Sequence, residues 1–204
     1  VGGYTLKKDQ RLIRDPNGGN KLYRNDGGSF TDVSESAGIY GSAIGFGLGV
    51  TIGDINRDGW QDIFVSNDFF EKDYLYINNG DGTFTESLEE IIGEISLGSM
   101  GADMADINND GWPEIFVTEM LPKEESRLKT KAIFEDWNKY RANVNAGYHR
   151  QFPRNVLQLN QGSPNTEGHI SMSEISRFSG VEATDWSWGA LIADYDNDGN
   201  KDMF

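Results

Sequence analysis

The chain has 204 residues, of which 33 are acidic and 18 are lysine or arginine, so its formal net charge is −15. This negative charge argues against a nucleic-acid backbone or an anionic membrane surface as a partner, and it is compatible with cation binding. The chain has no cysteine, which excludes a disulfide scaffold, a thiolate zinc site and a cysteine nucleophile. No apolar run approaches the roughly 20 residues of a membrane span, so no direct membrane insertion is expected.

A two-part repeat occurs three times along the chain. Its first part, at residues 21–39 and 74–92, reads as a strand, a tight turn and a second strand, and a shorter version occupies residues 156–162. The turn at residues 79–82 has the sequence Asn-Gly-Asp-Gly. Asn-Gly and Asp-Gly between such runs favour β-hairpins, so each first part is predicted to be a hairpin.

The second part of the repeat is an acidic loop between two apolar runs. It covers residues 49–65, 101–117 and 189–204, and we expect a strand on each side of each loop. One repeat therefore carries about four short strands. The loops begin at Asp54, Asp106 and Asp194, so the first spacing is 52 residues and the second is 88, which leaves an insert of 36 residues.

The insert contains the only helical periodicity in the sequence. Ile133, Trp137, Tyr140 and Val144 fall at positions i, i+4, i+7 and i+11, which predicts one apolar stripe. We therefore expect a helical insert over residues 122–146, packed against the sheets. An amphipathic helix that binds a partner is the alternative.

Four-stranded units that recur every 40–50 residues are typical of a β-propeller. The predicted fold class is all-β: residues 1–204 are expected to form a partial β-propeller of about three to four four-stranded blades with one helical insert. Propellers use roughly four to eight blades. We therefore interpret the chain as a fragment, and its end at Phe204, within a predicted strand, agrees with this. A linear stack of β-units is the alternative fold.

The acidic loops have the spacing of an oxygen-ligand metal site. In the first loop, Asp54, Asn56 and Asp58 occupy positions 1, 3 and 5, and Gly at position 6 permits a sharp turn. The carbonyl of Trp60 at position 7 and the carboxylate of Asp62 at position 9 complete the predicted shell. Calcium takes six to eight oxygen ligands in a flexible geometry, so this set suits Ca²⁺.

The other two loops repeat the pattern. The predicted ligands are, in the second loop, Asp106, Asn108, Asp110, the Trp112 carbonyl and Glu114, and in the third loop, Asp194, Asp196, Asp198, the Asn200 carbonyl and Asp202. Asx-rich turns closed by their own hydrogen bonds are the alternative. Three copies with acids at positions 1, 5 and 9 favour metal instead, so the predicted cofactor is Ca²⁺, about three ions, one per loop.

The loops resemble the FG-GAP/VCBS repeats of integrin α-subunit propellers and many bacterial surface proteins, and Phe46-Gly47 and Gly49 precede the first of them. Three longer segments, at residues 119–130, 147–162 and 180–204, resemble the bacterial members that carry an ASPIC/UnbV domain and are related to cartilage acidic protein. The resemblance implies a calcium-stabilised propeller, secreted or at the cell surface, that binds a protein or glycan ligand in adhesion and has no established catalytic residues.

Alternative functions depend on residues outside the loops. Trp186 and Trp188 are predicted to share one face of a strand, where packing between blades is the default and a carbohydrate platform is the alternative. An enzyme acting on polysaccharide would need acids such as Asp68 or Asp185. A scaffold module in an outer-membrane complex is a third possibility. The only two histidines, His149 and His169, lack a zinc pattern.

Overall fold

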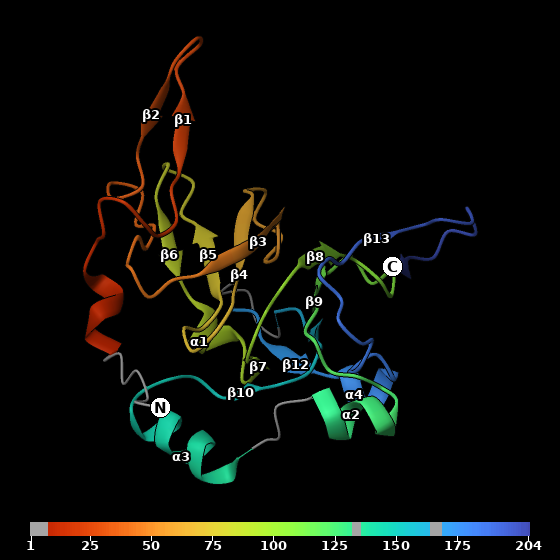
Figure 1. The fold of residues 1–204 in the computed structure, drawn as a ribbon. Helices are drawn as coiled ribbons and strands as arrows, with labels where there is room; N and C mark the ends of the chain where they lie inside the picture. Colours follow the sequence, from red (N-terminus) through yellow and green to blue (C-terminus); the bar gives the residue numbers. More distant parts are fainter. Residues whose placement is uncertain (1–7, 132–135, 164–168) are drawn as a thin grey trace.

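The computed structural model describes residues 8–131, 136–163 and 169–204. Two four-stranded antiparallel sheets stand side by side, and a two-stranded hairpin lies at each end of the described chain (Figure 1). The first sheet contains β3 (Gly47–Gly53), β4 (Asp62–Asn67), β5 (Tyr74–Asn78) and β6 (Phe84–Glu86) in chain order. The second contains β8 (Ala102–Ala105), β9 (Glu114–Val117), β11 (Val156–Asn160) and β12 (Met172–Glu174) in the same order.

The two-stranded hairpins each contain one part of the repeat. The pair β1 (Tyr23–Asn25) and β2 (Phe30–Asp32) corresponds to β5–β6, and the pair β13 (Ile192–Ala193) and β14 (Asp202–Met203) corresponds to β3–β4. The described residues thus form two four-stranded units and two half units. The prediction of three to four four-stranded blades was wrong in this respect, because a complete sheet needs both parts of the repeat and only the middle two sheets have them.

Short elements connect the sheets. The strands β7 (Ile95–Ser96) and β10 (Gln151–Phe152) form a parallel pair. The remaining elements of the described residues are one 3₁₀ helix and four short α-helices: η1 (Lys8–Leu12), α1 (Leu88–Ile91), α2 (Glu125–Lys131), α3 (Trp137–Asn145) and α4 (Ser176–Ser179). Since the described helices are short, none of them is long and apolar enough to cross a membrane.

The main hydrophobic core lies between the two four-stranded sheets. Phe64 and Leu75 of the first sheet are buried in one cluster with Ile115 and Val117 of the second. The antiparallel register places Phe64 opposite Leu75 on one face of the sheet. The residues next to them in each strand point to the other face, because side chains alternate along a strand. That other face of the first sheet, with Tyr76, packs on the loop that follows β2.

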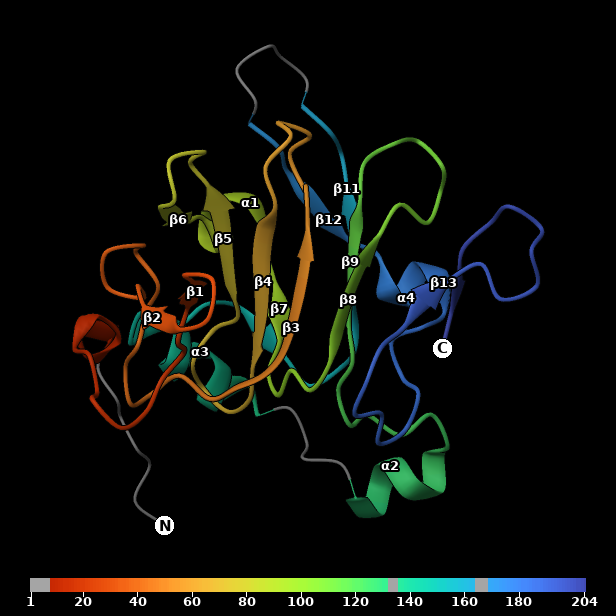
Figure 2. The same ribbon diagram turned by 90° about the horizontal axis from the view of Figure 1, so that it is seen from above.

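Glycines allow the first strands of successive sheets to approach closely. A Cβ atom added at Gly101 would lie 2.7 Å from Cα of Gly189, and one added at Gly49 would lie 3.3 Å from Cα of Gly101. These three glycines occupy the same position of the repeat. Figure 2 shows β3 beside β8 and β8 beside β13. The repeated glycine therefore sets the distance between neighbouring sheets.

A buried aspartate links the loop after β4 to the next sheet. Asp73 accepts hydrogen bonds from the backbone N–H of Asn67 at 2.7 Å and from the hydroxyl of Ser99 at 2.9 Å. Its side chain is fully buried, and burial raises the pKa of the Asp73 carboxyl to about 7. The protonated acid therefore fits this position at mildly acidic pH.

The predicted helix over residues 122–146 is replaced by two helices, α2 and α3. Ile133 of the predicted stripe lies in residues 132–135, outside the described part of the chain. The helix α3 begins after Asp136, whose carboxylate accepts a hydrogen bond from the backbone N–H of Asn138 at 2.9 Å. Tyr140 stacks on Phe152 of β10, whereas Trp137 is 66% exposed. Of the described residues in the predicted apolar stripe, Tyr140 therefore packs against β10, whereas Trp137 stays largely exposed to solvent.

The prediction of a strand at Trp186 and Trp188 was wrong. Residues 184–189 form an irregular segment, and β13 begins only at Ile192. Thr184 and Ser187 bond to each other through their hydroxyl groups, and the backbone N–H of Ser187 bonds to the carbonyl of Asp185. These local bonds compete with extension of the strand.

Replacement of Gly101 by alanine should destabilise the chain by about 1–3 kcal/mol, because the added methyl group would overlap the backbone of Gly189. Urea unfolding measures this change in the free energy of unfolding, provided that its dependence on urea concentration has the same slope in the variant and the wild type. Gly93→Ala is the control, since nothing lies within 4 Å of a Cβ at Gly93. Equal stability of the two variants would contradict the assigned glycine contact.

The Asp73→Asn variant should become more stable relative to the wild type as pH rises from about 4 to about 7. The raised pKa means that the folded wild type binds a proton more tightly than the unfolded chain, so the contribution of Asp73 to stability is present at low pH and lost as pH rises through about 7. The amide mimics the protonated acid. We expect a change of about 2–4 kcal/mol in the stability difference, measured by urea unfolding across this range. A constant difference would contradict the assigned pKa.

Candidate metal centre

The three acidic loops connect the first two strands of three successive repeat units. They lie between β3 and β4, between β8 and β9, and between β13 and β14. Figure 2 shows the first two loops at the end of the sheets opposite to α2. The strand pairing holds both ends of each loop; for example, Gly53 pairs with Asp62 across the base of the first loop.

Hydrogen bonds from backbone N–H groups curl the first loop around its side-chain oxygens. Both oxygens of Asp54 accept, one from the N–H of Asp58 at 3.0 Å and the other from the N–H of Gly59 at 2.9 Å. The N–H of Asp58 also bonds to the amide oxygen of Asn56 at 3.1 Å, and Asp58 accepts from the N–H of Trp60 at 2.8 Å. Positions 1, 3 and 5 therefore turn their oxygens toward the centre of the loop.

The second and third loops have the same geometry. The corresponding N–H bonds to Asp106 are 3.1 and 2.8 Å long, and those to Asp194 are both 3.0 Å long. The residues at positions 4 and 6 have left-handed backbone angles in every loop: φ is 61°, 60° and 61° at Arg57, Asn109 and Asn197, and 91°, 89° and 90° at Gly59, Gly111 and Gly199. One backbone conformation thus recurs three times, as the repeated spacing predicted.

The acid at position 9 ties each loop to its own second residue. Asp62 accepts from the N–H of Ile55 at 2.9 Å, Glu114 from the N–H of Ile107 at 2.9 Å, and Asp202 from the N–H of Tyr195 at 3.0 Å. Asp62 and Glu114 are buried, whereas Asp202 is exposed. The acid predicted to close the shell is therefore already folded back over the loop.

Burial makes the carboxylates of Asp62 and Glu114 difficult to ionise. It raises the pKa of Asp62 to about 6, although hydrogen bonds from the N–H groups of Asn78 and Ile55 oppose the shift. Burial likewise raises the pKa of Glu114. Oxygen Oε1 of Glu114 is buried and has no hydrogen bond of normal geometry among the described residues, although the backbone N–H of Asn160 lies near enough to the carboxylate to oppose the rise in its pKa. A nearby cation would offset both features, because it stabilises the ionised form and supplies a partner for that oxygen.

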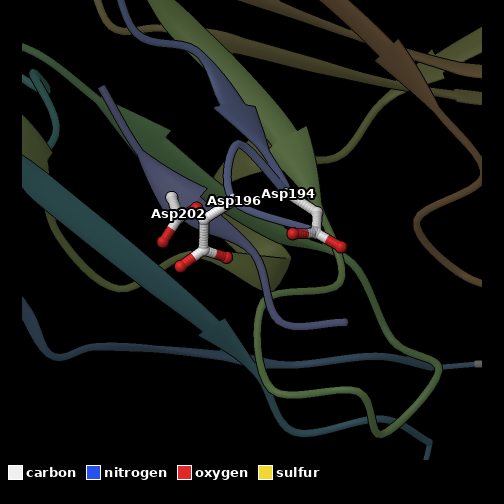
Figure 3. A group of neighbouring side chains, drawn as sticks. All are labelled: Asp194, Asp196 and Asp202. Carbon is white, nitrogen blue, oxygen red and sulfur yellow. The ribbon is translucent and has the colours of Figure 1, made fainter. Parts of the chain in front are cut away.

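The third loop brings three carboxylates together. Oxygens of Asp194, Asp196 and Asp202 lie within 4.8 Å of one another (Figure 3), so this group could hold a metal ion. In the first two loops position 3 is an asparagine, whose amide also donates a hydrogen bond to the acid at position 5 at 2.9 Å. An oxygen-only donor set of this kind suits a hard cation such as Ca²⁺ or Mg²⁺.

Two asparagines from the following strands support the loops, a role that was not predicted from the sequence. Asn78, at the end of β5, donates to the carbonyl of Gln61 at 3.0 Å. Asn160, at the end of β11, donates to the carbonyls of Ile55 and Pro113 at 3.0 and 3.1 Å. Asn160 therefore connects the first two loops. The repeated Asn at the end of these strands was the available signal.

Adjacent loops also touch through positions 4 and 7. The guanidinium of Arg57 lies over the ring of Trp112, with 5.1 Å between its Cζ and the ring centroid. Asn109 donates hydrogen bonds of 3.4 Å to the backbone carbonyl of Gly199 and to the side chain of Asn200. Asn200 therefore makes the contact to the preceding loop that Trp112 makes, although it lacks the indole ring.

The other candidate residues have ordinary structural partners. His149 bonds through Nε2 to the carbonyl of Ile92 at 2.9 Å, and burial lowers its pKa. Asp185 forms a two-point ion pair with Arg127, at 2.7 and 2.8 Å. Asp68 accepts a hydrogen bond from the N–H of Phe69 at 2.7 Å. Each of these three residues therefore has a structural contact within the chain.

Comparison with known sequences agrees with the repeat. A family model described as an FG-GAP-like repeat matches residues 10–65 and 54–117. Integrin alpha-3 of Mus musculus is 28% identical over 99 residues, covering 42% of this chain and 9% of the relative. Integrin alpha-7 of Mus musculus is 35% identical over 83 residues, covering 36% and 7% respectively. The chain thus spans less than a tenth of the length of these curated relatives.

The loss of Asn160 should destabilise the chain more than the loss of Asn78. The amide oxygen of each asparagine accepts from the N–H two residues later, at Gly162 and Gly80. Asn160 is buried and its amide donates to two carbonyls, whereas Asn78 is less buried and donates to one. We expect Asn160→Ala to lower the free energy of unfolding by about 2–3 kcal/mol and Asn78→Ala by about 1 kcal/mol. Urea unfolding of the two variants measures the order, and the reverse order would contradict the assigned coupling of the loops.

Proposed function

Because this chain belongs to the FG-GAP-like repeat family, whose model matches just over half of its residues, we propose that it is a calcium-stabilised, non-enzymatic β-propeller segment that presents a binding surface. The observation that carries the proposal is the one loop geometry repeated three times around oxygen donors. In this proposal the bound ions are structural. The surfaces beside them recognise a protein or glycan ligand outside the cell or at its surface.

Each loop is proposed to hold one calcium ion through side-chain oxygens at positions 1, 3, 5 and 9 and the carbonyl at position 7. The fit is supported by the curled loops, by the buried oxygen Oε1 of Glu114 and by the raised pKa of Asp62. Calcium is preferred over magnesium because Mg²⁺ demands a near-ideal octahedron and keeps several waters. When bound, the ions supply positive charge that offsets the ten acids of the three loops.

The packing of the sheets supports repeat units that pack face to face, as the blades of a propeller do. Ala102 and Met104 of β8 pack against the core formed with the first sheet. Their equivalents in β3, Val50 and Ile52, are 64% and 58% exposed. In a ring of such units, a further sheet would cover this face in the same way. The repeated close approach at Gly49 and Gly101 supports the same arrangement.

The residues of this chain would transmit the effect of each ion to its neighbours. A cation in the first loop would fix the carboxylates of Asp54 and Asp58. It would thereby also fix the backbone N–H groups that donate hydrogen bonds to them. Arg57 between them contacts Trp112 of the next loop. Ordering of one loop would therefore restrict the adjacent loop, and the row of loops would become a rigid edge.

The integrin alpha subunits among the relatives support a location outside the cell or on its surface, which we include in the proposal. The enzymatic alternative gains no support from Asp185, which is held by Arg127. A scaffold module of an outer-membrane complex would use the same binding surfaces, and no contact in the structure favours it over the leading proposal.

Replacement of Asp110 by asparagine should reduce the stabilisation by calcium. The amide keeps an oxygen that accepts from the N–H of Trp112 but removes one negative ligand. An ion present at 100 times its Kd stabilises the folded state by about 2.7 kcal/mol, so weaker binding at one loop lowers that gain. Thermal unfolding with 5–10 mM calcium, compared with excess chelator, measures the difference.

The matched control is Asp81→Asn. Asp81 is an exposed aspartate in an Asp-Gly turn, where it accepts from the N–H of Thr83 at 2.9 Å, but it lies outside the acidic loops. Its replacement should leave the calcium-dependent gain unchanged. If calcium and chelator give the same melting temperature in the wild type, or if both variants lose the gain equally, the proposed structural role of calcium is wrong.

A further inference from the structure

The segment between β9 and β11 is much longer than the sheet requires. In the first sheet, residues 68–73 connect β4 to β5. The equivalent connection in the second sheet runs over residues 118–155 and carries α2 and α3. Since six residues suffice for the same connection, the additional chain is free to serve another purpose. Long loops on a rigid scaffold are common places for binding sites.

The helix α3, the strand β10 and residues next to them line a partly open cavity of about 170 Å³. Its wall includes an aromatic array in which Tyr140 stacks with both Trp137 and Phe152. Both pairs have ring centroids 5.3 Å apart, with interplanar angles of 20° and 28°. Trp137 is 66% exposed. The cavity therefore has an aromatic wall that begins at the protein surface.

Polar side chains line the same cavity. Asp136, Lys139 and Asn143 come from α3, and Gln151 comes from β10. Gln151 is only 7% exposed, and its Oε1 is a buried atom without a hydrogen-bond partner among the described residues. Its Nε2 donates to the carbonyl of Glu71 at 3.4 Å. Because Oε1 of Gln151 has almost no solvent-accessible surface, this side chain forms part of the wall of the cavity and offers no hydrogen bond to a ligand.

The charges in the cavity favour a neutral ligand. Asp136 and Lys139 contribute one charge of each sign, and His149, which also lines the cavity, has a pKa lowered by burial and is neutral at pH 7. The net charge of the chain is −15, which disfavours an anionic ligand. The volume is below the roughly 300–1,000 Å³ of pockets for drug-sized ligands, so the cavity suits one small ring.

We propose that this cavity binds a neutral sugar residue, as a terminal ring of a glycan. A pyranose ring presents C–H groups on its face, which suit the negative face of an aromatic ring, and hydroxyl groups at its edge, which suit mixed donors and acceptors. The exposed ring of Trp137 provides the aromatic surface, and Asp136, Lys139 and Asn143 provide donors and acceptors. This inference rests on the proposed binding role and names the ligand class for it.

The test uses methyl glycosides of glucose, galactose, mannose and N-acetylglucosamine as probes for the full chain in calcium. Saturation-transfer NMR detects binding, and titration of the tryptophan indole signals measures its affinity. We expect at least one glycoside to bind with a Kd of millimolar order. Trp137→Ala should weaken that binding at least tenfold, and Asn143→Ala should weaken it several-fold.

The matched control is Trp188→Ala. Trp188 is 67% exposed, as Trp137 is, but lies in the irregular segment before β13. Its replacement should leave sugar binding unchanged. Absence of binding by all four glycosides, or binding lost in Trp188→Ala and kept in Trp137→Ala, would overturn the proposal.

Calcium stabilisation is measured on the same samples to separate the two proposals. Trp137→Ala should keep the full calcium-dependent rise in melting temperature, because its side chain is exposed and outside the acidic loops. Failure of sugar binding with this rise intact would overturn only the sugar site. Sugar binding through Trp137 without any rise would support the sugar site and overturn only the structural role of calcium.

Discussion

The concentration of negative charge in three tight loops is the constraint on which the structure depends. The loops contain ten of the 33 acids of the chain, and two of these, Asp62 and Glu114, are buried. Backbone N–H groups partly compensate the charge, since they donate to the acids at positions 1, 5 and 9. The pKa of Asp62, raised to about 6 by burial, shows that this compensation is incomplete. In the proposed function, a cation at the centre of each loop would complete it.

The loops and the sheets support one another. Asp62 belongs both to the first loop and to β4, and it accepts from the N–H of Asn78 at the end of β5 at 2.8 Å. Asn160 extends this connection to the neighbouring unit through the carbonyl of Ile55. The glycines at positions 49, 101 and 189 hold the first strands of the units close together. Changes in one loop therefore reach the core through a short series of hydrogen bonds.

The repeat made much of the architecture predictable from the sequence. The spacing from Asp54 to Asp106 placed two loops and their strands correctly, because tight turns and short strands depend on local residues. The insert was less predictable. The stripe at Trp137 and Val144 has helical spacing, yet Trp137 remains exposed, because the periodicity of a helix does not specify what its apolar face contacts. The role of Asn160 required knowledge of which loops are neighbours in space.

The measurement that tests the account most directly is the number of calcium ions bound per chain. Titration of the chelator-treated protein with calcium, followed by calorimetry, gives this number together with the affinity. The account predicts about three ions, with Kd values that extend to about 10⁻⁴–10⁻³ M for sites in extracellular modules. Binding of no calcium at several millimolar would contradict it, because the three loops would then be turns that their own hydrogen bonds hold closed.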